Sequence, residues 1–518
     1  MEAYIMKRKV FFVMLLAVMT ALCACTSGTN NGGESSDKVY YGGNIVVGIT
    51  QDLDSLDPHK AVAAGTKEVL YNIFEGLITV SKDGRFVPAV AESYTISEDG
   101  TVYSFKLRSG VKFHNGKTVT ADDVIYSLKR AAGMLGDSEP DINKIAAFSI
   151  ISDIKATADG VDVILSEPNT ELIGFFTSSI IPCDYKDQAT KPVGTGPFKF
   201  ESYEALQKFV VVKNEDYYIK GVPYLDQVTF KISASTDAAF MEVMAGSIDI
   251  LPYLTNDQAA QLAGKVDVVD GTMNLVQALF LNNAVKPFDD VRVRQAICYA
   301  IDRQSILDLV AGGRGVIIGT NMFPSFTEYY DETLVNTYPY DVLKAKELLK
   351  EAGYPDGISF SITIPSNYEF HVKTGEVIVD QLKKAGINAE IKLVEWATWV
   401  SDTYVGRDYE STIVGLDSKL APSDVLRFFF KDSSKNFVNY FSDDFDALFA
   451  KAKKTVNATE KAEYYKQLEK MLAEDAVSAF IQSPAQLVAV NKNLGGYTFY
   501  PVFVQDMSTV YYKVDPNK

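Results

Sequence analysis

Residues 378–393 combine a helix pattern with a strand pattern, and this combination limits the folds open to the chain. Apolar residues first recur at helical spacing and stop before Gly386, a residue type that commonly ends helices. From Ile387 to Leu393 apolar and polar residues alternate strictly, as in a half-buried strand. A helix joined through one glycine to a strand is the building unit of α/β folds, so we predict that fold class.

Strand and helix signals interleave along the rest of the chain. Residues 94–107 predict a hairpin with its turn at 97–100, and Thr120 with Asp123 predicts the capped start of a helix. The charged stretch 451–474 has few helix breakers and predicts a long helical segment. No short repeat is visible, which argues against solenoids and propellers. The architecture we predict is α/β with mixed sheets and more than one lobe.

The charge balance restricts the partners. The chain has 518 residues and a formal net charge of −17, and 47% of its residues are hydrophobic. A chain of this length can bury a large core without disulfides or metals. Its negative surface argues against nucleic acid and against anionic membrane as binding partners.

The first 24 residues have the pattern of an export signal. Lys7-Arg8-Lys9 is basic, and the nearly unbroken apolar run of 15 residues after it is shorter than the roughly 20 residues that span a bilayer. The run ends in Leu22-Cys23-Ala24-Cys25, which resembles the lipobox of bacterial lipoproteins. This resemblance implies cleavage before Cys25 and a lipid on its thiol. An ordinary signal peptide or a short membrane anchor is the alternative.

Residues 25–42 are predicted to form a flexible tether. Positions 26–37 are rich in Gly, Ser and Asn and lack apolar periodicity. A long tether directly after the lipid-bearing Cys25 is typical of a lipoprotein on the outer face of a Gram-positive cell membrane. We therefore predict an extracytoplasmic, lipid-anchored protein.

Motifs for catalysis and metal binding are missing. The chain has three histidines, none at zinc-binding spacing, and neither a nucleophile elbow nor a complete P-loop occurs. Asp52, Asp54 and Asp57 lack the glycine and the closing glutamate of a calcium loop, so we interpret them as a solvated loop. Cys298 lies in an apolar helical pattern, and no disulfide to Cys183 is expected. We predict no enzyme activity, no metal and no cofactor.

Five blocks of residues follow one another between positions 43 and 515. They are 56–59 with 72–77; 91–94 with 99–100 and 103–116; 193–198 with Asn214, Tyr217 and Tyr218; Asn283 with 287–296 and 300–303; and 345–354. In this order they resemble the extracellular solute-binding proteins of family 5, which serve peptide and nickel importers. Most of these residues specify the fold, and Arg292 and Arg294 are expected to pair with carboxylates near a lobe junction.

The resemblance implies a periplasmic-binding-protein-like fold of class II, cluster C, which is a two-lobed clamp with an extra domain. Domain I would hold residues 43–78, 192–281 and 491–518, domain II residues 79–191, and domain III residues 282–490. The chain would cross between the lobes near 281 and 490. Closing about these crossings would bury a solute between the lobes.

The resemblance implies a ligand between domains I and III. On domain I it implies Ala64 and Gly65, whose small size would let a ligand backbone approach closely. On domain III it implies Trp396 with the neighbouring Trp399, for which packing in the core is the alternative role. The predicted ligand-binding set is completed by His371, Tyr404, Gly415, Leu416, Asp417 and Ser418.

Asp417 is the candidate partner for the amino terminus of a peptide. In peptide-binding members of the family, an Asp four residues before a proline pairs with the α-ammonium, and the matching position before Pro422 is Ser418. A one-residue deletion would bring Asp417 into that place. The carboxylate matters because an unpaired buried ammonium costs several kcal/mol. Nickel is not expected, because a metal pocket needs more histidines than lie near this cleft.

The function that the resemblance implies is solute capture. The chain would be the lipid-anchored substrate-binding component of an ABC importer, taking an oligopeptide-like or dipeptide-like solute to the permease and ATPase subunits. The alternatives are a non-peptide solute, such as a glycan or an opine, and a sensor of peptide signals. We predict a monomer that touches the membrane through its lipid alone and binds no nucleic acid.

Overall fold

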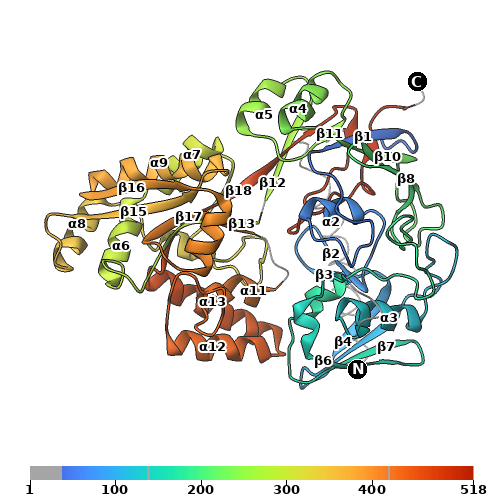
Figure 1. The fold of residues 1–518 in the computed structure, drawn as a ribbon, viewed down its shortest axis with the longest axis horizontal. Helices are drawn as coiled ribbons and strands as arrows, with labels where there is room; N and C mark the ends of the chain where they lie inside the picture. Colours follow the sequence, from blue (N-terminus) through green and yellow to red (C-terminus); the bar gives the residue numbers. More distant parts are fainter. Residues whose placement is uncertain (1–37, 137–140, 273, 418–420, 517) are drawn as a thin grey trace, which may run out of the picture. The chain divides into compact units, whose positions relative to one another are not determined.

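The strand β18, Ser478–Val490, belongs to both halves of a 12-stranded sheet. Its later residues pair antiparallel with β11 (Ile250–Leu251) and β12 (Asp267–Thr272), and its earlier residues with β13 (Leu275–Leu281) and β14 (Gly315–Ile317). The computed structural model describes residues 38–136, 141–272, 274–417, 421–516 and 518. Contacts join residues 39–518 into one compact unit, in which β18 connects the two halves of the sheet (Figure 1).

The half of the sheet around β1 (Asn44–Ile49) is mixed. β1 runs parallel to both β10 (Gln227–Ile232) and β11, and antiparallel pairs lead from β10 to β9 (Lys208–Lys213) and β8 (Phe198–Glu204). Ile45 and Val47 are buried, which confirms the predicted first strand. The helices that follow in this part of the chain are α2 (Ala64–Leu70), α4 (Thr236–Met244) and α5 (Asn256–Leu262).

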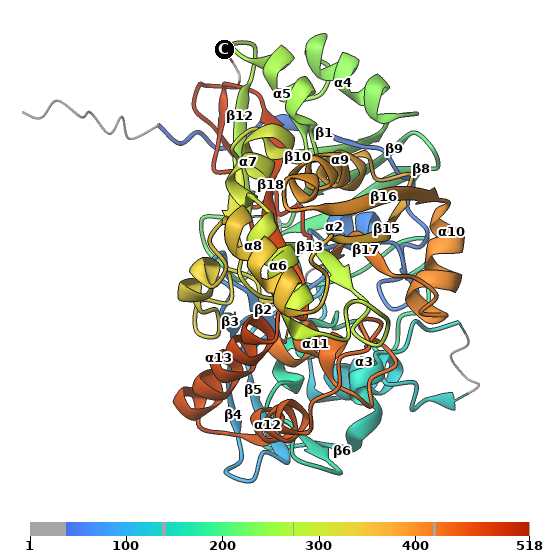
Figure 2. The same ribbon diagram turned by 90° about the vertical axis from the view of Figure 1, so that its left-hand side faces the viewer.

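The other half of the sheet holds three parallel strands. β15 (Ile358–Pro365) runs parallel to β16 (Ile387–Val394) on one side and to β17 (Ser411–Asp417) on the other. The helix α9 (Glu369–Lys384) packs on these strands and buries Ile378 and Leu382, which confirms the predicted helix–glycine–strand unit. Figure 2 shows three more helices in a row on one side of these strands: α6 (Val291–Ala300), α7 (Arg303–Ala311) and α8 (Val342–Glu351).

A separate antiparallel sheet has the strand order β4-β5-β7-β6, with bounds Ala91–Ile96, Val102–Leu107, Gly160–Leu165 and Ile151–Ala156. The helix α3 (Ala121–Ala131) contacts β6 and β7. The predicted hairpin is β4–β5, and the turn residue Gly100 has a φ of 69°, which favours glycine. Thr120 caps the start of α3, as predicted, and it forms a reciprocal capping box with Asp123. The α/β class with mixed sheets is therefore confirmed.

The long helical segment predicted over residues 451–474 is two helices. α12 spans Asp443–Lys454 and α13 spans Ala458–Glu474. The break has a local cause, because the Asn457 side chain accepts a hydrogen bond from the Glu460 amide at 3.0 Å and starts a new helix. The other short elements are β2 (Ile78–Val80), β3 (Phe86–Pro88), β19 (Leu494–Gly495), β20 (Tyr511–Tyr512), α10 (Trp396–Thr398) and α11 (Pro422–Leu426).

Two predictions about charged side chains are wrong. Arg292 pairs with Asp290 as expected, but Arg294 donates to the backbone carbonyls of Phe288 and Asp475 at 2.7 and 2.8 Å instead of to a carboxylate. Asp57 is 3% exposed and does not belong to a solvated loop. Arg294 finds its hydrogen-bond acceptors in buried carbonyl groups, and Asp57 finds its donor in a buried guanidinium group. The local sequence identifies neither kind of partner.

The Asp57–Arg130 pair ties the segment after β1 to helix α3. The two guanidinium nitrogens of Arg130 donate to the two carboxylate oxygens of Asp57 at 2.9 and 2.7 Å, and both side chains are 5% exposed. Burial acts to raise the pKa of Asp57, but Arg130 outweighs burial and lowers it. Asp57 is thus a charged partner in a bidentate buried ion pair.

No helix within the described ranges is both long and apolar enough to cross a bilayer. Cys183 and Cys298 are free thiols, in agreement with the predicted lack of a disulfide. The predicted export signal, Cys25 and residues 26–37 lie outside the described residues.

Glu75 joins residues 72–77 to the third block of the sequence. One carboxylate oxygen accepts from the hydroxyls of Tyr217 and Tyr218 at 2.9 and 2.8 Å, and the other accepts from Thr195 at 2.9 Å. The residue as a whole is partly exposed, yet its carboxylate is enclosed by these hydroxyls. Burial raises the pKa of Glu75 to about 7, and the hydrogen bonds and Arg108 oppose this rise.

Glu75 is expected to make the protein less stable as the pH rises. In the folded protein Glu75 keeps its proton up to a pKa of about 7, whereas the unfolded chain loses it near 4.5. The stabilisation is complete below 4.5 and is lost as the pH rises through 7, by about 2 kcal/mol after solvent screening. Urea unfolding at several pH values should show this loss in the wild type and not in Glu75→Gln. Parallel pH curves for the two proteins would contradict it.

Candidate functional site

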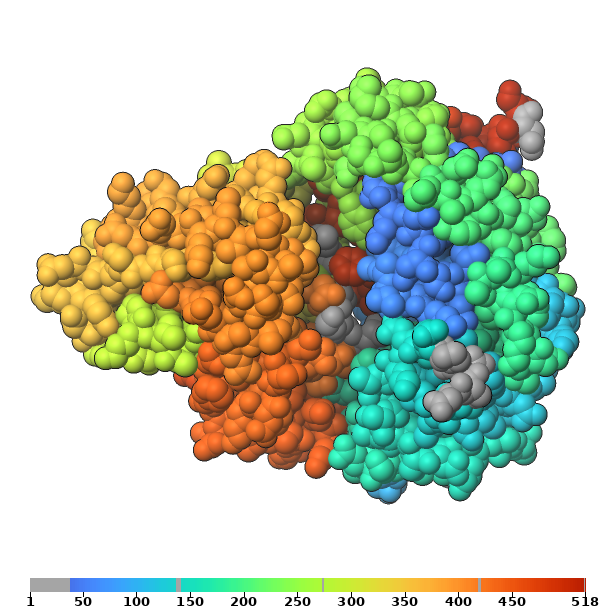
Figure 3. Space-filling view, viewed as in Figure 1, coloured from blue at the N-terminus to red at the C-terminus, as the bar shows by residue number. Residues whose placement is uncertain are grey.

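The strands β15 and β16 end level with each other, and β17 continues a few residues further in the same direction. Tyr368 and Trp396 follow the first two strands, and Asp417 is the last residue of β17. In open α/β sheets, ligands bind outside the carboxyl ends of parallel strands. In Figure 3 the surface is hollowed between the orange part of the chain near residue 400 and the blue part that includes α2. This edge of the sheet is therefore the candidate ligand site.

Trp396 presents an aromatic face at this edge. It is 41% exposed, and its ring stacks on Trp399 with 5.1 Å between centroids and 9° between planes. Tyr368, also 41% exposed, meets Trp396 edge to face at 5.3 Å. Two exposed rings held at right angles can cover the apolar parts of a solute.

Trp399 supports Trp396 from the core. It is 3% exposed, and its indole nitrogen donates to the Thr412 hydroxyl at 2.9 Å. The ring of Tyr404 stacks on the other side of Trp399 at 5.7 Å, and the Lys435 ammonium lies 5.2 Å from the centre of the Tyr404 ring. Of the three predicted aromatic residues, Trp396 offers the exposed face, and the other two hold it in place.

At the end of β17, the predicted ligand residues point alternately to opposite faces of the sheet. Leu416 is 8% exposed and packs in the same apolar cluster as Trp399. Asp417, the next residue, is exposed. At Gly415 a Cβ would lie 2.6 Å from the Leu275 side chain, so a larger residue would require that side chain on β13 to move. Ser418 lies outside the described residues.

His371 lies beneath this edge and is 6% exposed. Its Nδ1 accepts from the Gln277 amide nitrogen at 2.8 Å, which leaves the ring proton on Nε2. The Gln482 amide donates to Gln277 in turn, at 2.8 Å, so the three residues form one buried network. Burial lowers the pKa of His371 to about 4. The centroid of the neutral His371 ring lies 5.6 Å from that of the Tyr368 ring. His371 therefore contacts a residue of the candidate site and is itself buried.

Ala64 and Gly65 start helix α2 and keep an exposed backbone. The preceding residues are fixed by Asp54, whose carboxylate accepts from the amides of Val62 and Ala63 at 2.7 and 3.1 Å. No side chain of the other predicted ligand residues contacts Ala64 or Gly65 among the described interactions. These two positions are thus a small-residue wall on a separate element.

Glu68 on α2 is a buried acidic residue that sequence reasoning missed. Its carboxylate accepts from the Tyr253 hydroxyl at 2.6 Å and from the Gln505 amide at 3.3 Å. Burial raises the pKa of Glu68, and these two hydrogen bonds oppose the rise. Its partners are 185 and 437 residues away along the chain, so no local motif identifies it.

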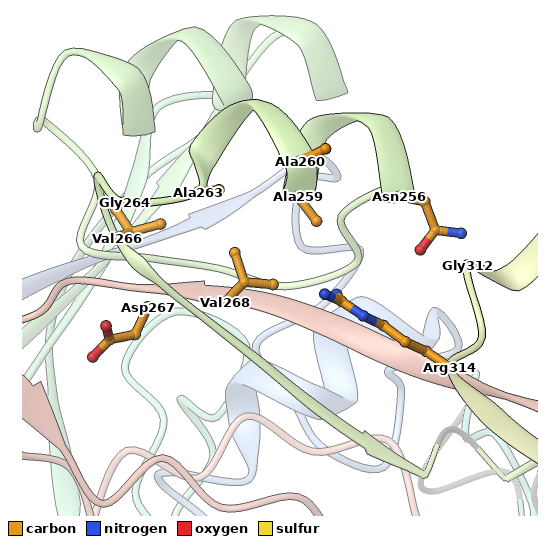
Figure 4. A pocket seen from close by; sticks show the side chains of 10 residues that line it. All are labelled: Asn256, Ala259, Ala260, Ala263, Gly264, Val266, Asp267, Val268, Gly312 and Arg314. Carbon is orange, nitrogen blue, oxygen red and sulfur yellow. The ribbon is translucent and has the colours of Figure 1, made fainter.

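A pocket of about 560 Å³ lies elsewhere and includes none of the predicted ligand residues. It is formed by α5, the start of β12 and the loop between α7 and β14. Figure 4 shows Arg314 extended towards α5, where Ala259 and Ala260 are small. The lining contains no aromatic side chain, so this pocket differs from the aromatic site that the resemblance implies.

Within the described residues, no group of three or more His, Cys, Asp or Glu side chains is arranged to hold a metal ion. Exposed groups at this edge include the Tyr368 and Trp396 rings and the Asp417 and Glu395 carboxylates. Two rings together with a carboxylate can bind a solute that has an apolar part and a positive charge.

Comparison with known proteins places these features in a family. The family model described as bacterial extracellular solute-binding proteins, family 5 (middle region), matches residues 85–437. The oligopeptide-binding protein AppA of Bacillus subtilis is 27% identical and covers 94% of this chain and 95% of its own. The glutathione-binding protein GsiB of Salmonella typhi is 28% identical and covers 88% of this chain and 92% of its own.

Three solved structures share the fold. The substrate-binding protein CtaP of Listeria monocytogenes has a TM-score of 0.81 at 25% identity, covering 92% of this chain and 100% of its own. DppA of Helicobacter pylori, in complex with the peptide STSA, has 0.72 at 27%, covering 92% and 99%. AgaA of A. tumefaciens R10, in complex with agropinic acid, has 0.69 at 28%, covering 91% and 99%. These neighbours confirm the predicted periplasmic-binding-protein-like fold.

Proposed function

Because the chain belongs to the bacterial extracellular solute-binding proteins of family 5, we propose that it captures a peptide for an ABC importer. One relative is named oligopeptide-binding protein, and a periplasmic binding protein with this fold is in complex with the peptide STSA. A binding protein of this kind works by holding a solute for a membrane partner, so no chemical step is required of it. The partners are the permease and ATPase subunits.

One observation carries the choice of a peptide. The carboxyl ends of β15, β16 and β17 bring the Trp396 and Tyr368 rings and the Asp417 carboxylate to one edge. The rings suit apolar side chains, and the carboxylate suits an α-ammonium group. A peptide offers both groups at its amino-terminal end.

We propose that capture is a closing of two lobes. The lobes are domain I (43–78, 192–281 and 491–518) with domain II (79–191), and domain III (282–490). Support comes from β18, whose two ends pair with strands of different halves of the sheet, so that a bend in its middle changes their relative angle. Ala64 and Gly65 would then form the wall that faces Trp396.

The proposal includes attachment to the outer face of the membrane through lipid on Cys25. The support is the order of basic, apolar and small residues before Cys25 in the sequence. Two or more acyl chains give stable attachment, whereas one chain is marginal. The Gly-, Ser- and Asn-rich residues after Cys25 would act as a tether that lets the folded body turn towards the permease.

Native mass spectrometry tests the function directly. Protein that begins at Thr26, purified from a bacterial host and titrated with a mixture of di- to nonapeptides, should retain discrete added masses that match peptides. Fragmentation of the complex identifies them. A protein that keeps its bare mass throughout the titration would overturn peptide capture.

A second candidate is a small non-peptide acid. The observation that favours it is the 28% identity to AgaA, which is in complex with agropinic acid. The same spectra separate the two candidates, because an added mass that yields no amino-acid fragments indicates such a solute.

Trp396 is expected to report on binding. The chain has two tryptophans, and only Trp396 is exposed. Peptide binding should change the tryptophan emission, and Trp396→Phe should remove most of the change. Trp396→Ala should weaken binding about 10-fold, through loss of about 1.4 kcal/mol of ring contact. The matched control is Trp399→Phe, which loses the hydrogen bond to Thr412 and should lower stability while keeping the emission change. If Trp396→Phe showed the same emission change as the wild type, this ring would not belong to the binding site.

A further inference from the structure

Glu171, in the segment between β7 and the following short helix, reaches helices α11 and α13, which come about 250 to 300 residues later. One carboxylate oxygen accepts from the Tyr465 hydroxyl, and the other accepts from the Ser423 amide at 3.1 Å. The side chain is 6% exposed. Each oxygen of this carboxylate therefore has a partner on the C-terminal helices.

A second buried contact lies beside it. The Lys461 ammonium donates to the Thr170 hydroxyl, and that hydroxyl donates to the Thr455 carbonyl at 3.0 Å. Lys461 is 6% exposed, and its charge faces Glu171. Burial raises the pKa of Glu171 and lowers that of Lys461, while each charge opposes the shift of the other. Both groups are therefore buried, and each favours the charged form of the other.

The two sides of this contact belong to different bodies of the fold. The Tyr103 hydroxyl on β5 donates to the Asn169 carbonyl at 2.6 Å, and the Asn169 amide donates to the Gly100 carbonyl at 3.1 Å. These bonds fix the Glu171 segment to the four-stranded sheet. Tyr465 packs in the same apolar cluster as Leu416 and Trp399. The contact is therefore a non-covalent bridge, separate from the crossing made by β18.

The bridge is close to the candidate ligand site along the chain. The amide of Ser423 donates to Glu171. Ser423 lies in the first turn of α11, six residues after Asp417. A carboxylate from the four-stranded sheet thus holds the helix that follows the site's own carboxylate. Movement of this contact would move the start of α11 relative to β17.

We propose that Glu171 is a positioning residue for solute capture, a pivot at which the four-stranded sheet stays in contact with α11 and α13 while the lobes close. This inference rests on the proposed function. Opening the contact would leave the Glu171 carboxylate and the Lys461 ammonium without these partners in apolar surroundings. Ligand binding would then have to offset that loss of free energy. A contact that persists through closure avoids the cost, and it gives the lobes a fixed point apart from β18.

Substitutions at the pivot test the positioning role. The probe is the peptide Ser-Thr-Ser-Ala, titrated by calorimetry into folded protein well below the unfolding temperature. Glu171→Ala should raise the Kd at least about 10-fold, and Glu171→Gln, which can still accept from Tyr465 and Ser423, should stay within about 3-fold of the wild type. Tyr464→Phe is the matched control, because its hydroxyl contacts the exposed Glu460 instead. A lowered Tm with an unchanged Kd in Glu171→Ala would reduce Glu171 to a structural role and overturn the proposal.

A cross-link tests whether the contact persists. Thr170→Cys with Thr455→Cys, in a Cys183→Ser background, is designed to form a disulfide where the Thr170 hydroxyl lies 3.0 Å from the Thr455 carbonyl, and non-reducing mass spectrometry checks that it forms. The oxidised and reduced proteins should bind Ser-Thr-Ser-Ala with Kd values within about 3-fold of each other. Binding by the reduced form alone would mean that the contact must open, and would overturn the pivot while leaving peptide capture standing. If neither the wild type nor the reduced variant binds this peptide or the peptide mixture, peptide capture fails, and the pivot's role in it fails too.

Discussion

Asp417→Asn is expected to bind a peptide with a free amino terminus at least about 30-fold more weakly than the wild type. Asp417 is the exposed carboxylate at the end of β17, on the same edge of the sheet as the Trp396 and Tyr368 rings. Removing one member of an enclosed charge pair costs about 2–5 kcal/mol, and each 1.4 kcal/mol is tenfold in Kd. Calorimetric titration with the peptide that the wild type retains in the mass spectrometer measures the change.

The control for Asp417 is a carboxylate away from the edge. Asp444 is exposed in the first turn of α12, and Asp444→Asn should bind the peptide as the wild type does. An N-acetylated copy of the peptide should bind the wild type and Asp417→Asn equally weakly, because it has no ammonium group to pair. Equal affinity of Asp417→Asn and the wild type for the free peptide would assign the ammonium to another partner.

Arg130→Met is expected to lower the free energy of unfolding by about 3–5 kcal/mol. The variant keeps most of the side-chain volume but leaves the Asp57 carboxylate, 3% exposed, without its bidentate partner. A buried charge left unpaired accounts for a loss of this size. Urea unfolding at pH 7, followed by circular dichroism, gives the value.

Two further variants identify the cause of that loss. Lys129→Met changes the neighbouring cation on α3, which has no ion pair among the described residues, and should cost less than about 0.5 kcal/mol. Adding Asp57→Asn to Arg130→Met should restore part of the stability, because the uncompensated charge is then gone. A loss below about 1 kcal/mol in Arg130→Met would show that the pair contributes little.

Local patterns predicted the elements that depend on neighbours in sequence. The helix–glycine–strand unit at 378–393, the β4–β5 hairpin and the Thr120 cap follow from periodicity, turn residues and a capping box, and the structure contains all three. The same reasoning failed at residues 455–457, where the Asn457 cap outweighs the helical composition on both sides. A polar cap is a single-residue signal that a long charged run hides.

The site was only partly predictable, because its support comes from distant residues. Trp396 and Asp417 follow from the family resemblance, and the structure puts them at the ends of β16 and β17, the two strands that flank β15. The role of Trp399 depends on the Thr412 hydroxyl, and that of His371 depends on Gln277. Glu171 meets Tyr465 across 294 residues of chain. Such pairs appear only when the whole sheet is assembled, so one sequence cannot reveal them.

The position of β18 near the end of the chain has a consequence for how the protein is made. β11, β12, β13 and β14 all pair with residues 478–490, so neither half of the large sheet has its full set of partners until nearly the whole polypeptide has been synthesised. Until then these four strands expose unsatisfied edges that invite pairing with other chains. Premature termination shortly before Ser478 would thus damage both halves at once, although it removes residues from only the last twelfth of the chain.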